Sequence, residues 1–192
     1  GIQVILFDMN GTLRMREPHE PTQVAANARI LELLGEKITT DLNWEELEHR
    51  YKAYGKWAQE NLVQASEKEI WTRWMLPEIP GSQIEPIASE LTLAWVERKG
   101  HTVPKPDAKK VLIELKKRGY RLGVISNSLS SLDIPRTIQK FGWTDLLDVV
   151  ILSSSVKYRK PAPEIFWEAT GSLKVEPSSC AFIGNRKSKD LV

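Results

Sequence analysis

The chain has 192 residues, which is enough for one α/β domain or for a core domain with an insertion. Its formal net charge of +2 is too small to favour nucleic acid, and its apolar stretches fall short of the roughly 18 residues that span a bilayer, so we expect neither partner. The single cysteine, Cys180, excludes an intrachain disulfide and suits the reducing cytosol, so we expect a cytoplasmic protein.

The first element is a near-continuous apolar run at residues 2–7 (IQVILF), as expected for a buried parallel strand. From residue 14 to about residue 105 the pattern predicts helices throughout and no strand. Asn43 and Ser66 have the character of helix N-caps, each followed three residues later by glutamate. Residues 101–106 (HTVPKP) predict a linker, because their two prolines disfavour helix.

The rest of the chain alternates helices with apolar strands. Helical patterns at 107–119, 133–142 and 161–171 separate the apolar runs at 120–126, 146–153 and 179–184. Such alternation is typical of a parallel sheet with right-handed crossovers. We therefore predict an α/β fold: a Rossmann-like parallel sheet core from residues 1–13 and 106–192, with an inserted all-helical cap domain at 14–105.

Chemically active side chains follow each of the four predicted strands. In an open parallel sheet, ligands bind beyond the carboxyl ends of the strands, so these side chains should lie close together. A carboxylate there can attack an electrophile, and a lysine, a hydroxyl and backbone N–H groups can hold an anion. The candidates, in chain order, are Asp8, Asn10, Thr12, Ser126, Asn127, Lys160, Asn185 and Asp190.

Four motifs, in order and on the expected elements, resemble those of the haloacid dehalogenase superfamily, most of whose members are phosphatases. They are DMNGTL (8–13), VISNS (124–128), YRKPAPEIF (158–166) and FIGNRKSKD (182–190). The helical insertion between the first two resembles the family's type-one cap. In the family the core usually continues past the fourth motif, so a chain ending at Val192 would leave the last strand uncovered.

The resemblance implies a role for each matching residue. Asp8 would be the nucleophile that forms an aspartyl-enzyme intermediate, Ser126 would bond the transferred group, and Lys160 would neutralise charge. A Mg²⁺ ion would be held by Asp8, the backbone carbonyl of Asn10, and the positions of Asn185 and Asp190. The implied partner is a small anionic, phosphorylated substrate, for which the further candidate contacts are Thr12, Asn127 and Arg14.

Two positions depart from the family pattern, and both lose a carboxylate. Asn10 stands where the family has the aspartate that protonates the leaving group and then activates water. An amide supplies no proton, and losing such help typically slows a reaction by about 100- to 10,000-fold. Asn185 stands where the family has a metal-binding aspartate, so Mg²⁺ binding should be weakened, because Mg²⁺ prefers charged oxygen ligands.

Three interpretations stay open from the sequence. The first, which we favour because most of the family are phosphatases, is a phosphohydrolase that is slow or limited to good leaving groups. The second is a non-catalytic relative that binds an anion or a partner. The third is a metal-independent dehalogenase, although Phe166 stands where those enzymes have a tyrosine and the gap from Asn185 to Asp190 is that of phosphatases.

The residues after the first motif, and the tryptophans, offer further candidates for substrate contacts. Arg14, Arg16 and His19 are expected at the entry to the cap, either as solvated charges or with an arginine meeting an anionic substrate. Five of the seven tryptophans fall in the helical block, where they are expected to pack a small bundle or to line an apolar pocket facing the core. The sequence predicts neither the substrate's identity nor the oligomeric state.

Overall fold

Four parallel strands form the sheet at one end of the molecule, in the order β5–β4–β1–β6. The structure, a computed structural model, describes residues 1–39 and 42–190; Val192, at which the chain was expected to stop, lies outside them. The strands are β1 (Val4–Phe7), β4 (Arg121–Ser126), β5 (Val149–Leu152) and β6 (Cys180–Ile183), each within an apolar run of the sequence. The predicted α/β, Rossmann-like fold is confirmed.

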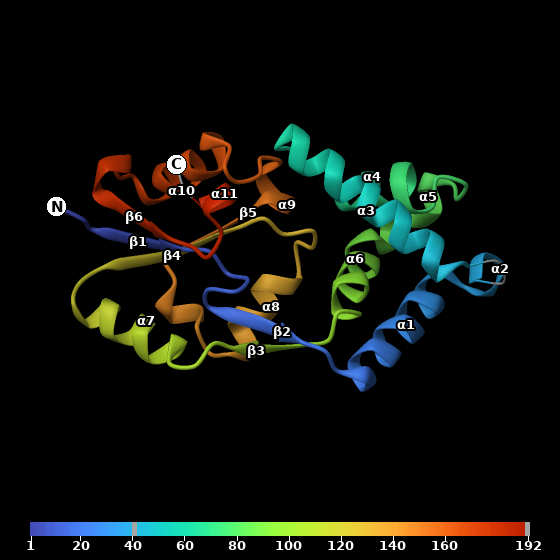
Figure 1. Ribbon diagram of the computed structural model, residues 1–192, viewed down its shortest axis with the longest axis horizontal. Helices are drawn as coiled ribbons and strands as arrows, with labels where there is room; N and C mark the ends of the chain where they lie inside the picture. The colour runs from blue at the N-terminus through green and yellow to red at the C-terminus, as the bar shows by residue number, and fades with distance from the viewer. Residues whose placement is uncertain (40–41, 191–192) are drawn as a thin grey trace.

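Helices cover both faces of this sheet (Figure 1). Helices α7 (Ala108–Lys117) and α8 (Asp133–Lys140) pack on one face, where Phe7, Leu122 and Val124 are buried. Helix α10 (Pro163–Leu173) packs on the other face against Val4, Leu6, Ile125 and Ile151. Neighbouring residues of one strand face opposite layers, which explains why the strands are apolar at nearly every position.

The chain order makes β1 the centre of the sheet. After β1 the chain returns through β4 and β5 on one side, and then crosses to β6 on the other side of β1. Ligands bind in the crevice where the direction of winding reverses, beyond the carboxyl ends of the strands. The residue that follows β1, Asp8, therefore stands at the favoured position.

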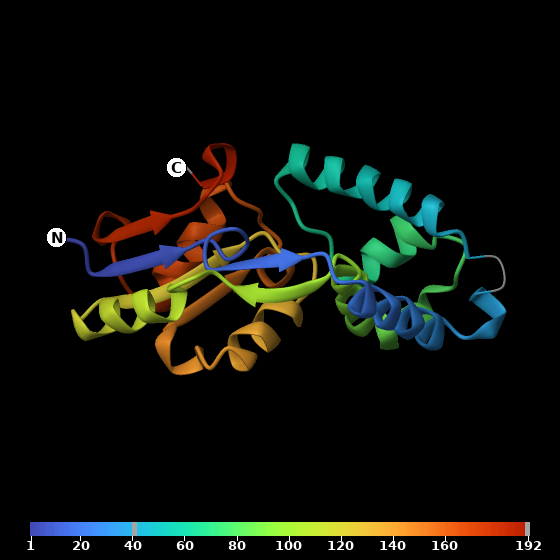
Figure 2. The same ribbon diagram turned by 60° about the horizontal axis from the view of Figure 1, so that its bottom comes forward.

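A second, two-stranded sheet joins the two ends of the molecule, and here the sequence-based prediction was wrong. Strands β2 (Arg14–Glu17) and β3 (His101–Pro104) pair antiparallel, where a helix-only block and a linker were expected. Figure 2 shows them running side by side from the sheet to the helical block. Pro104 is tolerated because it stands at the end of β3 and because both strands of a two-stranded sheet are edge strands.

The helical block has its own hydrophobic core. That core is formed by α1 (Glu20–Leu34), α3 (Trp44–Asn61), a π-helix η1 (Ile70–Met75) and α6 (Ala88–Glu97), with buried Trp71 and Trp95 between them. Shorter turns complete it: α2 (Glu36–Thr39), α4 (Glu67–Glu69), α5 (Gly81–Ile84) and η2 (Glu85–Ile87). The separate core supports, as a proposal, the division into a sheet core (1–13 and 106–192) and a cap (14–105).

Two helix starts in the cap follow the expected capping. The side chain of Asn43 accepts hydrogen bonds from the backbone N–H groups of Glu45 and Glu46. Ser66 and Glu69 form a reciprocal capping box at the start of α4. These bonds satisfy N–H groups that the helix itself leaves unpaired.

The cap also contacts the sheet core beyond β2 and β3. The backbone of residues 62–64 pairs with residues 157–159: Gln64 N donates to the carbonyl of Lys157 at 2.6 Å, and Arg159 N donates to that of Leu62 at 3.0 Å. The carboxylate of Glu67 accepts from Ser131 N at 2.8 Å. The cap is therefore docked on the core close to Lys160.

The remaining short elements of the core are α9 (Ser153–Val156), η3 (Thr144–Leu146), η4 (Pro177–Ser179) and α11 (Lys187–Asp190). None of the helices formed by residues 1–39 and 42–190 has the length and apolar character that a membrane crossing needs.

Candidate active site

Asp8 lies at the carboxyl end of β1, at the bottom of a small pocket. Its backbone N–H donates to the carbonyl of Ile183 at 2.8 Å, which fixes it between β1 and β6. The following turn is closed by hydrogen bonds from Leu13 N and Arg14 N to the carbonyl of Met9. Only 8% of Asp8 is exposed, so its carboxylate needs a partner.

The partner of Asp8 is Lys160, which is itself 3% exposed. Its Nζ lies 2.7 Å from Oδ1 of Asp8 and 2.7 Å from Oδ1 of Asp190. Burial raises the pKa of Asp8 above its ordinary value, although Lys160 opposes that shift. The structure thus brings the predicted nucleophile, lysine and fourth-motif acid into direct contact.

Asn127 holds the backbone of Lys160. Its Nδ2 donates to the carbonyl of Lys160 at 3.0 Å, and its Oδ1 accepts from Lys160 N at 2.7 Å. Both ends of the amide are therefore engaged. The structure gives Asn127, a candidate for substrate contact, a positioning role for the lysine.

Two predicted hydroxyl residues are buried without a hydrogen-bond partner. Ser126 ends β4 and is fully buried, and Thr12 lies in the turn after Asp8. In the part of the chain described, the hydroxyl oxygen of each lacks a hydrogen-bond partner. A buried hydroxyl without a partner costs free energy, and an ordered water or a ligand can supply the missing hydrogen bond.

Arg14 has a different place from the substrate contact predicted for it. It is 2% exposed, and its guanidinium contacts three side chains: Oδ1 of Asn10 at 2.9 Å, Oγ1 of Thr137 at 2.7 Å and Oδ2 of Asp133 at 2.5 Å. Arg16 binds the other oxygen of Asp133 at 2.9 Å. The first motif is therefore tied to α8 through Arg14, and neither arginine lines the pocket at Asp8.

His19 stands at the start of α1, away from that pocket. Its Nδ1 bonds Oγ1 of Thr22 at 2.8 Å, and its ring packs edge-on against His101, with the ring centroids 4.6 Å apart. His19 stands at the N-cap position of α1, but its side chain makes no capping hydrogen bond there. The structure therefore places all three residues of the cap entry in packing or ion-pair contacts.

We expect Arg14→Met to lower the free energy of unfolding by about 3 kcal/mol. The substitution leaves the buried carboxylate of Asp133 with only one of its two arginine partners, Arg16. Although burial tends to raise the pKa of Asp133, the two arginines hold it below its ordinary value, so the carboxylate is ionised at neutral pH. Urea denaturation measures the change. The control is Arg29→Met, which removes an exposed pair with Glu32 and should change stability by less than about 1 kcal/mol. Equal losses in the two variants would contradict this role of Arg14.

Asn185 and Asp190 follow β6, and of the two only Asp190 lines the pocket at Asp8. The amide of Asn185 lies against Gly11, whose φ of 87° is a backbone conformation that residues with a side chain rarely adopt. The carboxylate of Asp190 accepts from Arg186 N at 2.8 Å as well as from Lys160. The predicted residues of the fourth motif are thus placed next to the turn after β1.

These residues do not fit a tight magnesium site. Two carboxylates, Asp8 and Asp190, face the pocket, and one ammonium group already binds both. Among the described residues, no group of three or more histidine, cysteine or acidic side chains could hold a metal ion. The other oxygens offered at this end, from Asn10 and Asn185, are neutral, whereas Mg²⁺ sites depend on carboxylates.

Two residues of this pocket were missed by the sequence-based prediction. The pocket has a volume of about 180 Å³ and is lined by Asp8, Asn10, Asn127, Lys160, Arg186, Lys189 and Asp190. Burial and the nearby cations Arg186, Arg159 and Lys160 lower the pKa of Lys189. The signal was the basic run within NRKSKD, which from sequence alone is typical of a solvated turn.

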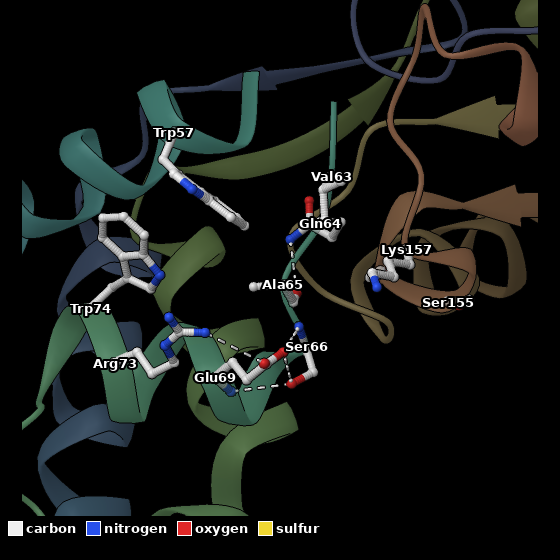
Figure 3. Close-up of a pocket in the computed structure, with 11 residues that line it drawn as sticks. Trp57, Val63, Gln64, Ala65, Ser66, Glu69, Arg73, Trp74, Ser155 and Lys157 are labelled. Atoms are coloured by element: carbon white, nitrogen blue, oxygen red, sulfur yellow. Dashed lines mark hydrogen bonds and ion pairs between the residues drawn. The ribbon is translucent and has the colours of Figure 1, made fainter. Parts of the chain in front are cut away.

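A larger pocket of about 590 Å³ lies where the cap meets the core (Figure 3). Trp57 and Trp74 of the cap form one wall, and Lys157 and Ser155 of the core face them. Two of the cap tryptophans thus line a pocket toward the core, as one interpretation of the sequence expected. The pocket shares no lining residue with the pocket at Asp8.

Comparisons with known proteins agree with this geometry. A family model described as hydrolase, haloacid dehalogenase-like hydrolase, matches residues 2–191. A glyceraldehyde 3-phosphate phosphatase of Methanopyrus kandleri is 26% identical over 99% of this chain and 78% of its own length. A ribulose-1,5-bisphosphate 5-phosphatase of Halopiger xanaduensis is 24% identical over 97% of this chain and 78% of its own.

Solved structures share the fold. The 2-haloacid dehalogenase from Pseudomonas syringae pv. Tomato DC3000 superposes with a TM-score of 0.69 at 21% sequence identity, over 100% of this chain and 81% of that chain. At that identity the likeness concerns the fold alone.

Proposed function

The chain belongs to the haloacid dehalogenase-like hydrolases, and on that premise we propose that it hydrolyses small phosphomonoesters through covalent catalysis by Asp8. The observation that carries the proposal is the contact between Asp8, at the end of the central strand, and the buried ammonium of Lys160 at 2.7 Å. Relatives that align along nearly the whole chain are phosphatases of small phosphorylated compounds. A buried carboxylate held beside a cation is suited to attack a phosphoryl group.

The reaction has two steps. An oxygen of Asp8 attacks the phosphorus, the bond from phosphorus to the ester oxygen breaks, and the leaving group departs as an alkoxide or phenolate. Water then attacks the phosphorus of the aspartyl phosphate, which releases inorganic phosphate and restores the carboxylate. Lys160 neutralises the negative charge on the carboxylate and the phosphoryl oxygens in both steps.

Asn10 sets the limits of this chemistry. It lines the pocket, but its amide neither protonates the leaving oxygen nor takes a proton from water. Turnover is therefore slow, and substrates whose leaving group is stable as an anion are favoured. The proposed substrate is a small phosphorylated compound that enters a pocket of about 180 Å³.

We assign no step of the reaction to a metal ion. The Mg²⁺ ion that the family implies is proposed here only as weakly bound, because Asn185 offers a neutral oxygen in place of a carboxylate. We also propose a cytoplasmic location, which the single, half-buried Cys180 supports.

The test is hydrolysis of an aryl phosphate, with and without Mg²⁺, by this chain and by the Asn10→Asp, Asn185→Asp double variant. We expect slow turnover by the chain and faster turnover by the double variant. Absence of turnover in both forms would reject the proposal and leave an anion-binding relative. Chloride release from a 2-chloro acid without phosphate hydrolysis would instead identify a dehalogenase.

A further inference from the structure

The pocket at Asp8 holds more positive than negative side chains. Its lining includes two carboxylates, Asp8 and Asp190, and three cations, Lys160, Arg186 and Lys189. The two positions at which the family pattern has further carboxylates are asparagines here. The pocket therefore carries a net positive charge without any bound metal ion.

Arg186 and Lys189 belong to one turn that the fold holds against the site. The backbone N–H of Asp190 donates to the carbonyl of Arg186 at 2.9 Å, and Asp190 Oδ2 accepts from Arg186 N at 2.8 Å. Because Asp190 is in turn bound to Lys160, this turn has a fixed position relative to Asp8. Lys189 is half-buried there, and Asp8 acts on it electrostatically.

We propose that Arg186 and Lys189, together with Lys160, supply the positive charge that binds the phosphoryl group, so that this site binds phosphate without a divalent cation. The inference rests on the proposed function, since the anion in question is the phosphoryl group of the substrate. It assigns to two side chains the charge that a magnesium ion would contribute.

The donor chemistry fits this assignment. A guanidinium binds phosphate oxygens in a bidentate manner, and an ammonium binds them as a compact point charge. A dianion that enters the pocket therefore meets donors on several sides and no excess of carboxylates.

The two asparagines and the three cations act on an anion in the same direction. A pocket with four carboxylates needs a divalent ion before it accepts a phosphate, because like charges repel. With Asn10 and Asn185 in place, the same cations make the pocket attractive to an anion directly. We infer that the two neutral asparagines favour the binding of an anion at this site.

The experiment measures the binding of inorganic phosphate to the full chain by titration calorimetry, once in EDTA and once with Mg²⁺. We expect dissociation constants that agree within about twofold. We expect Lys189→Met and Arg186→Met each to weaken binding in EDTA by about tenfold, which corresponds to about 1.4 kcal/mol. Lys189→Arg should retain most of the affinity.

The control is Lys117→Met, which removes the same charge from the exposed end of α7, outside the pocket. It should bind phosphate as the unchanged chain does. Circular dichroism of each variant verifies that it is folded.

Two outcomes would overturn the inference: phosphate binding that requires Mg²⁺, or unchanged affinity in both Lys189→Met and Arg186→Met. The proposed function fails separately. Metal-independent phosphate binding without any aryl phosphate turnover would reject hydrolysis and keep the anion site, whereas aryl phosphate turnover together with phosphate binding that requires Mg²⁺ would keep hydrolysis and reject the anion site.

Discussion

Replacing Asn10 with aspartate should raise the turnover of an aryl phosphate about 100-fold, the lower end of what general acid–base catalysis contributes. The new carboxylate lines the pocket beside Asp8 and can take a proton from the water that attacks the aspartyl phosphate. Steady-state rates on one substrate measure the gain. Rates that do not differ between the two forms would mean that position 10 does not face the reacting group.

We expect the rise in turnover of the Asn10→Asp variant to stay at about 100-fold because of Arg14. Its Nε donates to Oδ1 of Asn10 at 2.9 Å, and after the substitution it would hold the carboxylate in the ionised form. An ionised residue works as a base but poorly as an acid, so we expect a smaller gain with alkyl phosphates. Asn27→Asp is the matched control, since Oδ1 of Asn27 also accepts from an arginine Nε, that of Arg98, but in the cap.

Lys160→Met should lower the turnover by about 100- to 1,000-fold, the effect of removing a group that stabilises charge in the transition state. It should also move the acid limb of the pH profile to higher pH. Burial and the neighbouring Asp190 both raise the pKa of Asp8, and Lys160 is the group that opposes them. A larger fraction of Asp8 is then protonated and unreactive at a given pH.

The matched control for this prediction is Lys68→Met, which removes an exposed lysine paired with Glu85 in the cap. It should leave both the rate and the pH profile unchanged. An unshifted acid limb in Lys160→Met, together with a normal rate, would show that Lys160 does not act on Asp8.

The sheet was predictable from sequence because its strands are buried on both faces. Continuous apolar runs between helices have few other interpretations, whereas the register of β1 with β4 and β6 is known only from the structure. Strands β2 and β3 were not predictable. Their residues are largely polar, and the burial of Arg14 depends on Asp133, which is far away along the chain.

The same contrast holds for the site. The convergence of Asp8, Ser126, Lys160 and Asp190 could be predicted because the carboxyl ends of parallel strands meet at one edge. Two partners of Arg14, Asp133 and Thr137, could not, since they lie on α8. Arg186 and Lys189 escaped notice because a basic turn is indistinguishable from a solvated surface until its position in the lining of the pocket at Asp8 is known.

The measurement that tests the central claim most directly compares aryl phosphate turnover by the Asn10→Asp variant with turnover by the same variant carrying Asp8→Asn. If Asp8 is the nucleophile, the second substitution removes at least about 1,000-fold of the rate. Equal turnover with and without the Asp8 carboxylate would contradict the account, because the phosphoryl group would then be transferred by some other group.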